Sequence, residues 1–221
     1  MCQPFSAGVL QIDTRAPSRQ HIPMCNLYRM TKAHEEVARW FNAIDQLGKS
    51  NFGDEVFPGY PGAVVADGKL QQMTWRFPLT LKSKRTGKPL KPKPVNNARS
   101  DKLDEYMWRY SFEERRCLIP LTAWAEAEGK PGNKTRTWLS RPDAGLFAAA
   151  GLWRNSDEWG LVYTMVMTDS AGAAAECHSR MPVLLVQDDW SKWTDGTPSE
   201  ARRLCKPWTG ELAVERTDQR W

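Results

Sequence analysis

The sequence predicts an α+β fold, built mainly on an antiparallel, barrel-like β-sheet with a few flanking helices. Segments with the pattern of strands outnumber those with the pattern of helices, and the two do not alternate as they do in a parallel βαβ fold. No internal repeat divides the 221 residues, and this length suits one domain of ordinary size. We therefore expect a single domain over residues 24–221. Residues 1–23, a polar segment interrupted by three prolines, are expected to form a disordered leader.

The first elements follow directly after this leader. Thr31 is a candidate N-cap, and apolar residues then recur at helical spacing, which predicts a helix over about 32–44. The dipeptide Asp67-Gly68 lies between the apolar runs 63–66 and 70–75. Because this dipeptide favours a two-residue type I′ turn, the two runs are predicted to form a β-hairpin.

Runs of apolar and β-branched residues between turn residues predict the other strands. These strands are expected at 117–119, 146–153, 161–167, 181–186 and 211–215. Two short helices are expected at 102–110 and, after Ser199 as N-cap, at 200–204.

The positive charge is concentrated in one stretch of the chain. There are 31 Lys+Arg against 26 Asp+Glu, a formal net charge of +5. Residues 68–100 hold nine of the basic residues and no acidic one, which leaves 22 basic against 26 acidic residues elsewhere. Segregated positive charge is typical of a protein that binds a polyanion, because phosphate contacts release counterions. A solvated, lysine-rich loop has the same pattern, and charge alone does not decide between the two.

Several classes of protein are disfavoured by composition. No apolar run approaches the roughly 18 residues that a membrane span needs, and the start of the chain lacks the apolar segment of a secretory signal. The five cysteines form no CxxC pair, which disfavours a disulfide scaffold and a structural zinc site. We therefore expect a cytoplasmic monomer with no membrane contact, no metal and no cofactor.

Four short motifs combine residue types that carry chemistry. They are Met24-Cys25-Asn26-Leu27-Tyr28, Asn96-Asn97-Ala98-Arg99-Ser100, Arg115-Arg116-Cys117-Leu118-Ile119-Pro120 followed by Trp124 and Glu126, and His178-Ser179-Arg180-Met181-Pro182. Taken singly, each has an ordinary structural interpretation: an Asn-Asn turn, a surface glutamate in a salt bridge, a structural histidine before a strand. In this order, however, the four resemble the landmarks of the SRAP family of SOS-response-associated, abasic-site-processing proteins. The resemblance covers about residues 24–214.

The resemblance implies a function and a set of catalytic residues. A protein of this family binds single-stranded DNA with an abasic site and forms a thiazolidine cross-link with the ring-opened deoxyribose through an N-terminal cysteine. The resemblance also implies that the cross-link protects the lesion during the DNA damage response, with weak lyase activity as a side reaction. It further implies that the protein is associated with the nucleoid while it is bound to DNA. The residues that match the catalytic positions are Cys25, Asn97, Glu126 and His178.

The match at Glu126 rests on its distance from Pro120. Glu126 follows Pro120 by six residues, as in the family, whereas its neighbour Glu128 does not fit this spacing. The family often has a tyrosine and a tryptophan around this glutamate, where the present chain has Ala125 and Ala127. The packing of the pocket is therefore expected to differ.

The position of the Met-Cys pair departs from the family pattern, in which this pair begins the chain. Here the matching Met24-Cys25 follows 23 residues, and Met1-Cys2 is a rival. We favour Cys25 because it leads directly into the first predicted helix and lies at family-like distances from the other motifs. Translation is then expected to begin at Met24, with Met24 removed afterwards.

A free N-terminus matters for the chemistry. An α-amine has a pKa of roughly 7.7–8.0, against roughly 10.4 for lysine, so its neutral, nucleophilic form is far more abundant at pH 7. It attacks the aldehyde to form a Schiff base, and the thiol on the adjacent carbon then closes a five-membered ring. With the leader attached, only the thiol of Cys25 would remain, and a reversible hemithioacetal is the best available product.

Residues near the motifs are candidates for DNA binding. Arg99 shares a strand face with Asn97, and its guanidinium can take a phosphate bidentately. The other candidates are Arg180, Arg85 in the basic stretch, and the indoles of Trp75 and Trp124, which could stack with unpaired bases, although most of the eleven tryptophans are expected in the core. Two alternatives remain open: a thiol-dependent (auto)peptidase using Cys25, His178 and Glu126, and a non-catalytic single-stranded DNA-binding module.

Overall fold

The structure is a computed structural model that describes residues 25–48 and 53–221. The predicted leader, residues 1–23, and Met24 lie outside the described residues, so the predictions made for them remain predictions.

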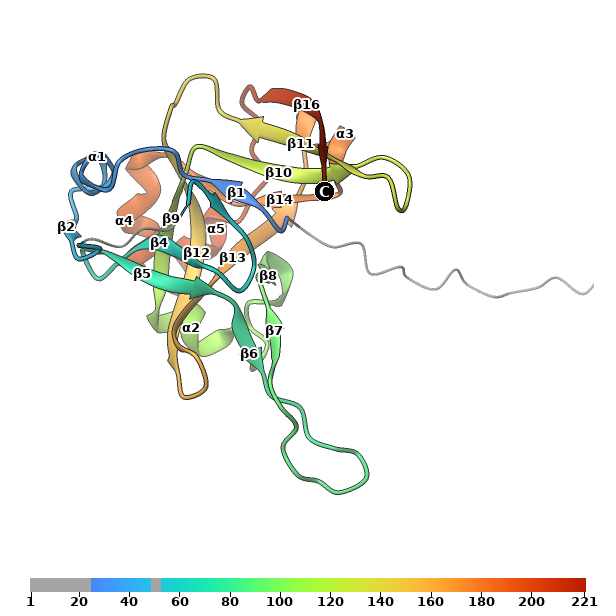
Figure 1. Ribbon diagram of the computed structural model, residues 1–221. Coiled ribbons are helices and arrows are strands. Elements are labelled where there is room, and N and C mark those ends of the chain that lie inside the picture. The colour runs from blue at the N-terminus through green and yellow to red at the C-terminus, as the bar shows by residue number, and fades with distance from the viewer. Residues whose placement is uncertain (1–24, 49–52) are drawn as a thin grey trace, which may run out of the picture.

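A closed ring of five strands forms the centre of the molecule (Figure 1). Its members are β4 (Pro61–Ala66), β5 (Lys69–Trp75), β9 (Arg116–Leu121), β12 (Phe147–Ser156) and β13 (Gly160–Asp169). The pairs β5–β4, β4–β9, β9–β12 and β12–β13 are antiparallel, and β13 returns to β5 in parallel at Val162↔Thr74 and Tyr163↔Trp75. The predicted barrel-like, mainly antiparallel sheet is thus confirmed.

Four short strands extend this sheet. They are β2 (Ile44–Asp45), β8 (Asn97–Arg99), β14 (Arg180–Pro182) and β15 (Leu184–Leu185). Both β8 and β14 pair with the end of β13, β8 in parallel and β14 antiparallel. The second and fourth sequence motifs are therefore brought to the same strand.

A second, five-stranded sheet lies across the top of Figure 1 in the order β16-β11-β10-β1-β3. Its strands are β1 (Tyr28–Arg29), β3 (Glu55–Val56), β10 (Ala123–Glu128), β11 (Thr135–Ser140) and β16 (Ala213–Arg220). A separate hairpin of β6 (Phe77–Leu79) and β7 (Lys93–Val95) projects from the opposite side of the body, as Figure 1 shows.

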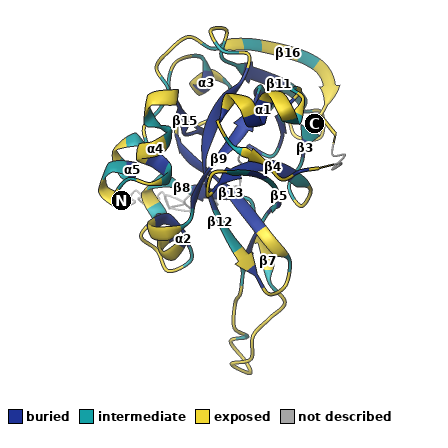
Figure 2. Cartoon of the chain, turned by 90° about the vertical axis from the view of Figure 1, so that its left-hand side faces the viewer, coloured by how far each residue is buried: buried dark blue, intermediate teal, exposed yellow. Residues whose placement is uncertain are grey.

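The helices are short and lie outside the sheets, with their exposed faces outward (Figure 2). They are α1 (His34–Trp40), α2 (Arg109–Glu114), α3 (Gly172–Cys177), α4 (Trp190–Thr194), α5 (Pro198–Leu204) and the 3-10 turns η1 (Ser100–Lys102) and η2 (Gln187–Asp189). No helix in the described part of the chain is long and apolar enough to cross a membrane.

Aromatic residues fill the region where the two sheets meet. Tyr28 and Tyr163 are fully buried with their hydroxyl oxygens 2.5 Å apart. Trp75 packs against both rings, with centroids at 5.2 Å from Tyr28 and 6.3 Å from Tyr163. A Cβ at position 62 would collide with both hydroxyls, so Gly62 makes the room that this pair needs.

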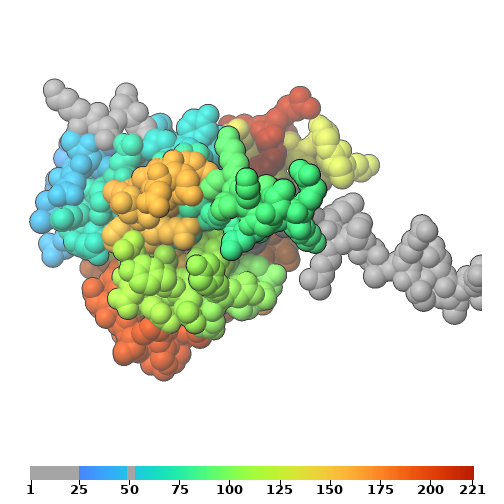
Figure 3. All heavy atoms as spheres, turned by 90° about the horizontal axis from the view of Figure 1, so that it is seen from below, coloured from blue at the N-terminus to red at the C-terminus, as the bar shows by residue number. Residues whose placement is uncertain are grey.

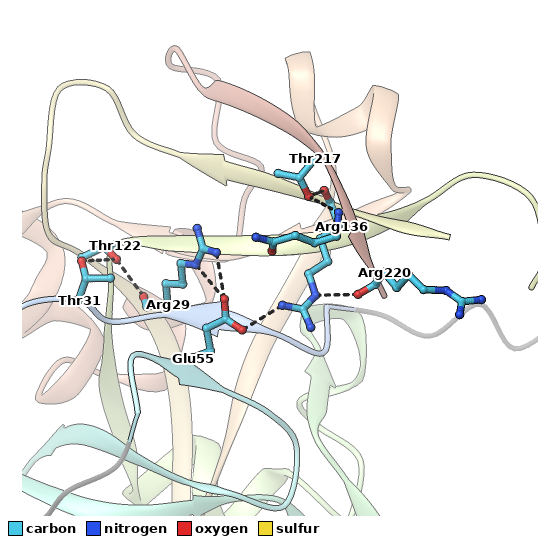
Figure 4. A network of polar contacts seen from close by, with 8 residues as sticks. Arg29, Thr31, Glu55, Thr122, Arg136, Thr217 and Arg220 are labelled. Carbon is cyan, nitrogen blue, oxygen red and sulfur yellow. Dashed lines mark hydrogen bonds and ion pairs between the residues drawn. The ribbon is translucent and has the colours of Figure 1, made fainter. Parts of the chain in front are cut away.

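An ion-pair network holds the very short strand β1 in place, as Figure 4 shows. Glu55 on β3 accepts from Arg29 of β1 at 2.9 Å and from Arg136 of β11 at 3.0 Å. Arg136 also donates to the carbonyl of Arg220 on β16 at 3.0 Å. One carboxylate on β3 thereby binds an arginine of β1 and an arginine of β11, two strands of the same sheet that do not pair with each other.

The predicted elements and the structure agree in part. Asp67 and Gly68 have φ of 50° and 70°, which confirms the predicted hairpin turn. All five further predicted strands overlap observed strands, but the helix predicted at 102–110 is wrong, because η1 and turns occupy most of that segment and α2 begins at Arg109. The last helix is capped by Thr197 with Glu200 in a capping box and Pro198 in its first turn, rather than by Ser199.

The first helix is shorter than predicted. It begins at His34 after Ala33, and the hydroxyl of Thr31, the predicted N-cap, instead donates to Thr122 at 3.3 Å. It ends at Trp40 because Asn42 adopts a positive φ of 49°, after which Ile44 pairs with β5 as part of β2.

Candidate active site

Cys25 is the first described residue and is anchored through its backbone. Its carbonyl oxygen accepts a hydrogen bond of 2.7 Å from Nδ2 of Asn97, and its thiol donates to the carbonyl of Leu27 at 3.6 Å. The same Leu27 carbonyl accepts from the amide of Ala125 on β10 at 2.9 Å. The segment leading into β1 therefore lies between β8 and the strand that carries Glu126.

Glu126 lies on β10 with its carboxyl group almost completely buried, at 2% exposure. Burial raises the pKa of this carboxyl group well above its ordinary value, because the charged form loses its hydration. Oε2 lies 4.0 Å from Nδ1 of His178, and Oε1 has no hydrogen-bond partner among the described residues. Such a carboxyl group can hold a proton at a higher pH than a surface glutamate and can also release it.

His178 lies between α3 and β14. Its amide donates to the carbonyl of Ala174 at 3.0 Å. Its Nδ1 lies 3.1 Å from the backbone amide of Arg180 and 3.1 Å from the carbonyl oxygen of the same residue, so the tautomer decides whether Nδ1 accepts from the amide or donates to the carbonyl. When Nδ1 accepts this bond, the neutral imidazole carries its proton on Nε2. Nε2 is buried and has no partner in the described part of the chain, so it is available to a bound substrate.

Asn97 completes the group from β8, where it pairs with Met165 of β13. Its Nδ2 holds the Cys25 carbonyl, while its Oδ1 is buried and unpartnered within residues 25–48 and 53–221. Buried polar atoms are normally hydrogen-bonded, so the unpartnered atoms of Asn97, Glu126 and His178 can each bind a polar ligand or a water molecule. The structure thus brings all four predicted catalytic residues to one region.

The thiol of Cys25 is protonated in this environment. Burial raises its pKa well above the ordinary value, and the negative charge of Glu126 raises it further. A thiol of this kind is a weak nucleophile until a neighbouring base takes its proton. The carboxylate of Glu126, whose charge acts on the thiol, is a candidate for that base.

Glu128, the other glutamate of this strand face, is occupied by structural contacts. It accepts from the hydroxyl of Thr137 and lies 3.2 Å from Nε of Arg216. The nearby thiol of Cys177 has its pKa raised to about 11, by burial first and then by the charge of Glu128. Glu128 therefore lacks the unpartnered buried oxygen that Glu126 has.

Two hollows adjoin the four residues. One, of about 470 Å³, is lined by Glu128, Cys177 and His178 among others. The other, of about 400 Å³, is lined by Asn26, Leu27, Phe57, Pro58, Asn96, Arg136 and Trp221. The first touches the site through His178, and the second touches it through the immediate neighbours of Cys25 and Asn97.

The predicted phosphate-binding arginines flank the site but are paired with acids. Arg99 makes two hydrogen bonds to Asp101, of 2.9 and 2.5 Å, and these bonds hold the pKa of the Asp101 carboxyl group below its ordinary value. Nη1 of Arg180 lies 3.3 Å from Asp169 and 3.9 Å from Asp101. The sequence analysis identified both arginines but not their acidic partners, although Asp101 follows Arg99 by only two residues.

The other predicted DNA contacts are placed differently. Trp75 and Trp124 are both 0% exposed, so neither indole presents a face to a base, and the stacking predicted for them is not available in this structure. Trp75 instead donates to the carbonyl of Asn96 at 2.8 Å and so supports the strand that carries Asn97. Arg85 is exposed in the projecting β6–β7 hairpin, which Figure 3 shows from below, and is not part of the four-residue site.

Sequence reasoning also missed Asn96 as a site neighbour. Its Oδ1 is buried without a described partner, and it lines the second hollow. The described residues contain no group of three His, Cys, Asp or Glu that could hold a metal ion. The four described cysteines, Cys25, Cys117, Cys177 and Cys205, are all free.

Known proteins with similar sequences match most of the chain. The chain is 25% identical over 208 residues to the abasic site processing protein YoqW of Bacillus subtilis, covering 85% of this chain and 89% of that protein. It is 26% identical over 187 residues to the abasic site processing protein YobE of the same bacterium, covering 77% and 81%.

Solved structures share the fold at lower identity. A protein of Bacteroides thetaiotaomicron superposes with a TM-score of 0.73 at 19% identity, covering 87% of this chain and 91% of that one. A protein of Bordetella bronchiseptica gives 0.72 at 21% identity, covering 87% and 99%. The family described as SOS response associated peptidase (SRAP) matches residues 24–220. The chain therefore belongs to the SRAP family.

Proposed function

We propose that this protein processes abasic sites in single-stranded DNA by forming a covalent cross-link through Cys25. The observation that carries the proposal is the convergence of Cys25, Asn97, Glu126 and His178, three of which hold a buried, unpartnered polar atom. The similarity to proteins named for abasic site processing supports the substrate. The cross-link would shield the lesion from strand cleavage.

The proposed reaction requires the α-amine of Cys25 to be free, which means that residues 1–24 are removed. The amine attacks C1′ of the ring-opened deoxyribose, and the resulting carbinolamine loses water to give an imine. Sγ then adds to the imine carbon while the thiol proton passes to the nitrogen, which closes the thiazolidine ring. One water molecule is released, and no oxidant or reductant is needed.

Each site residue has a role that its contacts support. Glu126, with its raised pKa, delivers a proton to the departing hydroxyl of the carbinolamine and accepts one from the Cys25 thiol. Nε2 of His178 and Oδ1 of Asn97 are free to form hydrogen bonds with the sugar hydroxyl groups. The Nδ2 contact of Asn97 holds the Cys25 backbone at the point where its amine must meet the aldehyde. A strand-cleaving lyase reaction would be a side branch of the same imine.

A thiol peptidase built from Cys25, His178 and Glu126 is less well supported. Such an enzyme needs a thiolate with a lowered pKa, whereas burial and Glu126 raise the pKa of Cys25. In addition, His178 lies against Glu126 and Arg180. N-acetylation of the mature chain separates the two functions, since it would leave a peptidase active and abolish cross-linking.

The decisive experiment measures an SDS-resistant adduct between the chain that starts at Cys25 and an oligonucleotide with one abasic site. Cys25→Ala should lose the adduct and keep non-covalent binding to the same DNA. Cys177→Ala is the matched control, because it removes a second thiol near the site and should leave the adduct intact. An adduct that persists in Cys25→Ala would overturn the proposal, and so would one that disappears only in Cys177→Ala.

A further inference from the structure

The two arginines beside the site are already bound by a carboxylate. Arg99 donates through Nε and Nη2 to the two oxygens of Asp101, at 2.9 and 2.5 Å. This fork-to-fork pairing is the geometry with which an arginine binds a phosphate group. Asp101 therefore takes up the donors of Arg99 that a DNA phosphate would need.

Asp101 also faces the second arginine. Arg99 and Arg180 lie on β8 and β14, which both pair with the end of β13, at Met167↔Arg99 and Asp169↔Arg180. Oδ1 of Asp101 lies 3.9 Å from Nη1 of Arg180, and Asp169 lies 3.3 Å from the same atom. Two guanidinium groups and two carboxylates form one cluster whose formal charges cancel.

This cluster lies at the edge of the proposed active site. Arg99 is two residues from Asn97, and Arg180 is two residues from His178. The side chain of Asp101 is 49% exposed and that of Arg99 is 41% exposed, so an incoming strand can reach both. A phosphate that reaches these arginines must displace Asp101 or lie beside its negative charge.

We propose that Asp101 is a specificity-determining residue, which competes with DNA phosphates for Arg99 and Arg180 and so weakens the reversible binding of undamaged strands. The inference rests on the proposed cross-linking function, because that function explains why weak reversible binding is useful. An undamaged strand is held only by reversible contacts and dissociates quickly. A strand with an abasic site is retained by the covalent bond, so the same competition leaves its final yield almost unchanged.

The competition predicts a change in affinity with a definite sign. Asp101→Asn removes the negative charge and frees the Arg99 donors, so undamaged single-stranded DNA should bind about three- to tenfold more tightly at physiological salt. The logarithmic salt dependence should steepen by about 0.7 for each additional phosphate that the freed arginines bind. If Asp101 served only to orient Arg99, the same substitution would weaken binding.

The chain offers a matched control for this substitution. Arg141 and Asp143 repeat the Arg-x-Asp pairing, with hydrogen bonds of 3.0 and 2.6 Å, in the turn before β12. Asp143→Asn therefore removes an ion pair of the same spacing and hydrogen-bond pattern, and the same formal charge, at a position outside the site. Asp101→Glu keeps the charge and serves as the conservative variant.

The experiment measures fluorescence anisotropy of a labelled undamaged oligonucleotide with the wild type, Asp101→Asn, Asp101→Glu and Asp143→Asn, at several salt concentrations. We expect tighter binding and a steeper salt dependence for Asp101→Asn alone, and Asp101→Glu should stay near the wild type. Equal or weaker binding by Asp101→Asn would overturn the inference, as would equal tightening by Asp143→Asn.

A parallel measurement of adduct on abasic DNA separates this inference from the proposed function. If the wild type forms the adduct and Asp101→Asn does not bind undamaged DNA more tightly, only the role of Asp101 fails. If Asp101→Asn binds more tightly and no variant forms an adduct, the cross-linking function fails and the competition at the arginines stands.

Discussion

In the proposed reaction, Glu126 is the residue that transfers protons. It is buried, its Oε1 lacks a partner among the described residues, and its charge acts on the thiol of Cys25. We expect Glu126→Gln to slow cross-link formation about 100-fold, within the range typical of a lost general acid–base, and to leave non-covalent DNA binding unchanged. Single-turnover adduct formation measures the rate, and anisotropy measures the binding.

Glu128→Gln is the matched control for this substitution. Glu128 lies on the same strand face, two residues further along, but it is held by Thr137 and Arg216. It should keep the wild-type rate of adduct formation. An unchanged rate in Glu126→Gln, or an equal loss in Glu128→Gln, would contradict the assignment.

Glu126 should also give the fold a distinctive pH dependence. Its pKa is raised by burial in the folded chain, against about 4.3 in the unfolded chain. Between these two values the folded protein binds the additional proton, so this contribution to stability is complete below the unfolded value and is lost as pH rises through the folded value. Glu126→Gln cannot lose a proton and should not show this decline.

Thermal unfolding between pH 5 and pH 8 measures the effect. At pH 8 we expect Glu126→Gln to be more stable than the wild type by about 0.5–2 kcal/mol, as is common when a functional site gives up its chemistry. For a chain of this length that is about 2–4 °C in Tm per kcal/mol. Parallel Tm profiles of the two proteins across this pH range would show that Glu126 binds the same number of protons in the folded and unfolded states, so that burial does not raise its pKa.

At this scale the sequence predicted residue types and positions well and their surroundings poorly. The motifs and their family resemblance named Cys25, Asn97, Glu126 and His178, which the structure brings together. The burial of Trp75 and Trp124 could not be predicted, because an indole beside a motif has the same sequence pattern whether it faces a base or the core. That outcome is decided by contacts with distant residues such as Tyr163 and Phe147.

Among the elements, the β6–β7 hairpin carries the positive charge that the sequence analysis singled out. Its exposed loop holds Lys82, Lys84, Arg85, Lys88 and Lys91. The hairpin projects from the body in Figure 1. Its second strand, β7, is followed directly in the chain by β8, which carries Asn97 and Arg99. This arrangement favours contact of the loop with a flanking part of the nucleic acid rather than with the abasic sugar.

Replacing Lys82, Lys84, Arg85 and Lys88 together by glutamine tests this role. Binding to single-stranded DNA should weaken, and the slope of log affinity against log salt should become shallower by up to about 3, since each phosphate contact contributes about 0.7. The Tm should stay within about 1 °C, because these side chains lie outside the core. Lys130→Gln, in the exposed loop between β10 and β11, is a control that should change neither. An unaltered slope in the fourfold variant would show that these four side chains make no phosphate contacts and are only solvated.

The elements that sequence reasoning placed correctly are those with a local signal. The Asp67-Gly68 turn needs positive φ at both residues, and the sequence supplies the residues that adopt it. By contrast, β1, β2 and β3 have two residues each. Strands of this length exist only because a distant strand pairs with them, and no local pattern identifies them. The loss of the predicted last turn of α1 has the same origin, since Ile44 pairs with Lys69 instead of continuing the helix.

For the molecule as a whole, the closed ring of strands explains how one site can draw on distant motifs. The parallel return of β13 to β5 closes the barrel, and β8 and β14 then extend from the same end of β13. Two residues that are 81 positions apart are thereby brought close to β13, with Asn97 on β8 and His178 just before β14. The second sheet contributes Cys25 and Glu126, so the proposed site lies where the two sheets meet.

In the proposed reaction, the state of the N-terminus decides whether Cys25 can form the thiazolidine ring. We predict that active protein begins at Cys25, because only a free α-amine next to the thiol can form the thiazolidine ring.

Two preparations test this: the chain with residues 1–221 and a chain that starts at Cys25. Intact-mass analysis gives the first residue of each, and an SDS gel with abasic oligonucleotide gives the adduct. The Cys25 chain should form a stable adduct, and the longer chain should form one only in the fraction whose mass shows that residues 1–24 have been removed. A stable adduct on a chain whose mass still includes those residues would exclude the amine of Cys25 as the nucleophile, because that amine would then be tied up in a peptide bond.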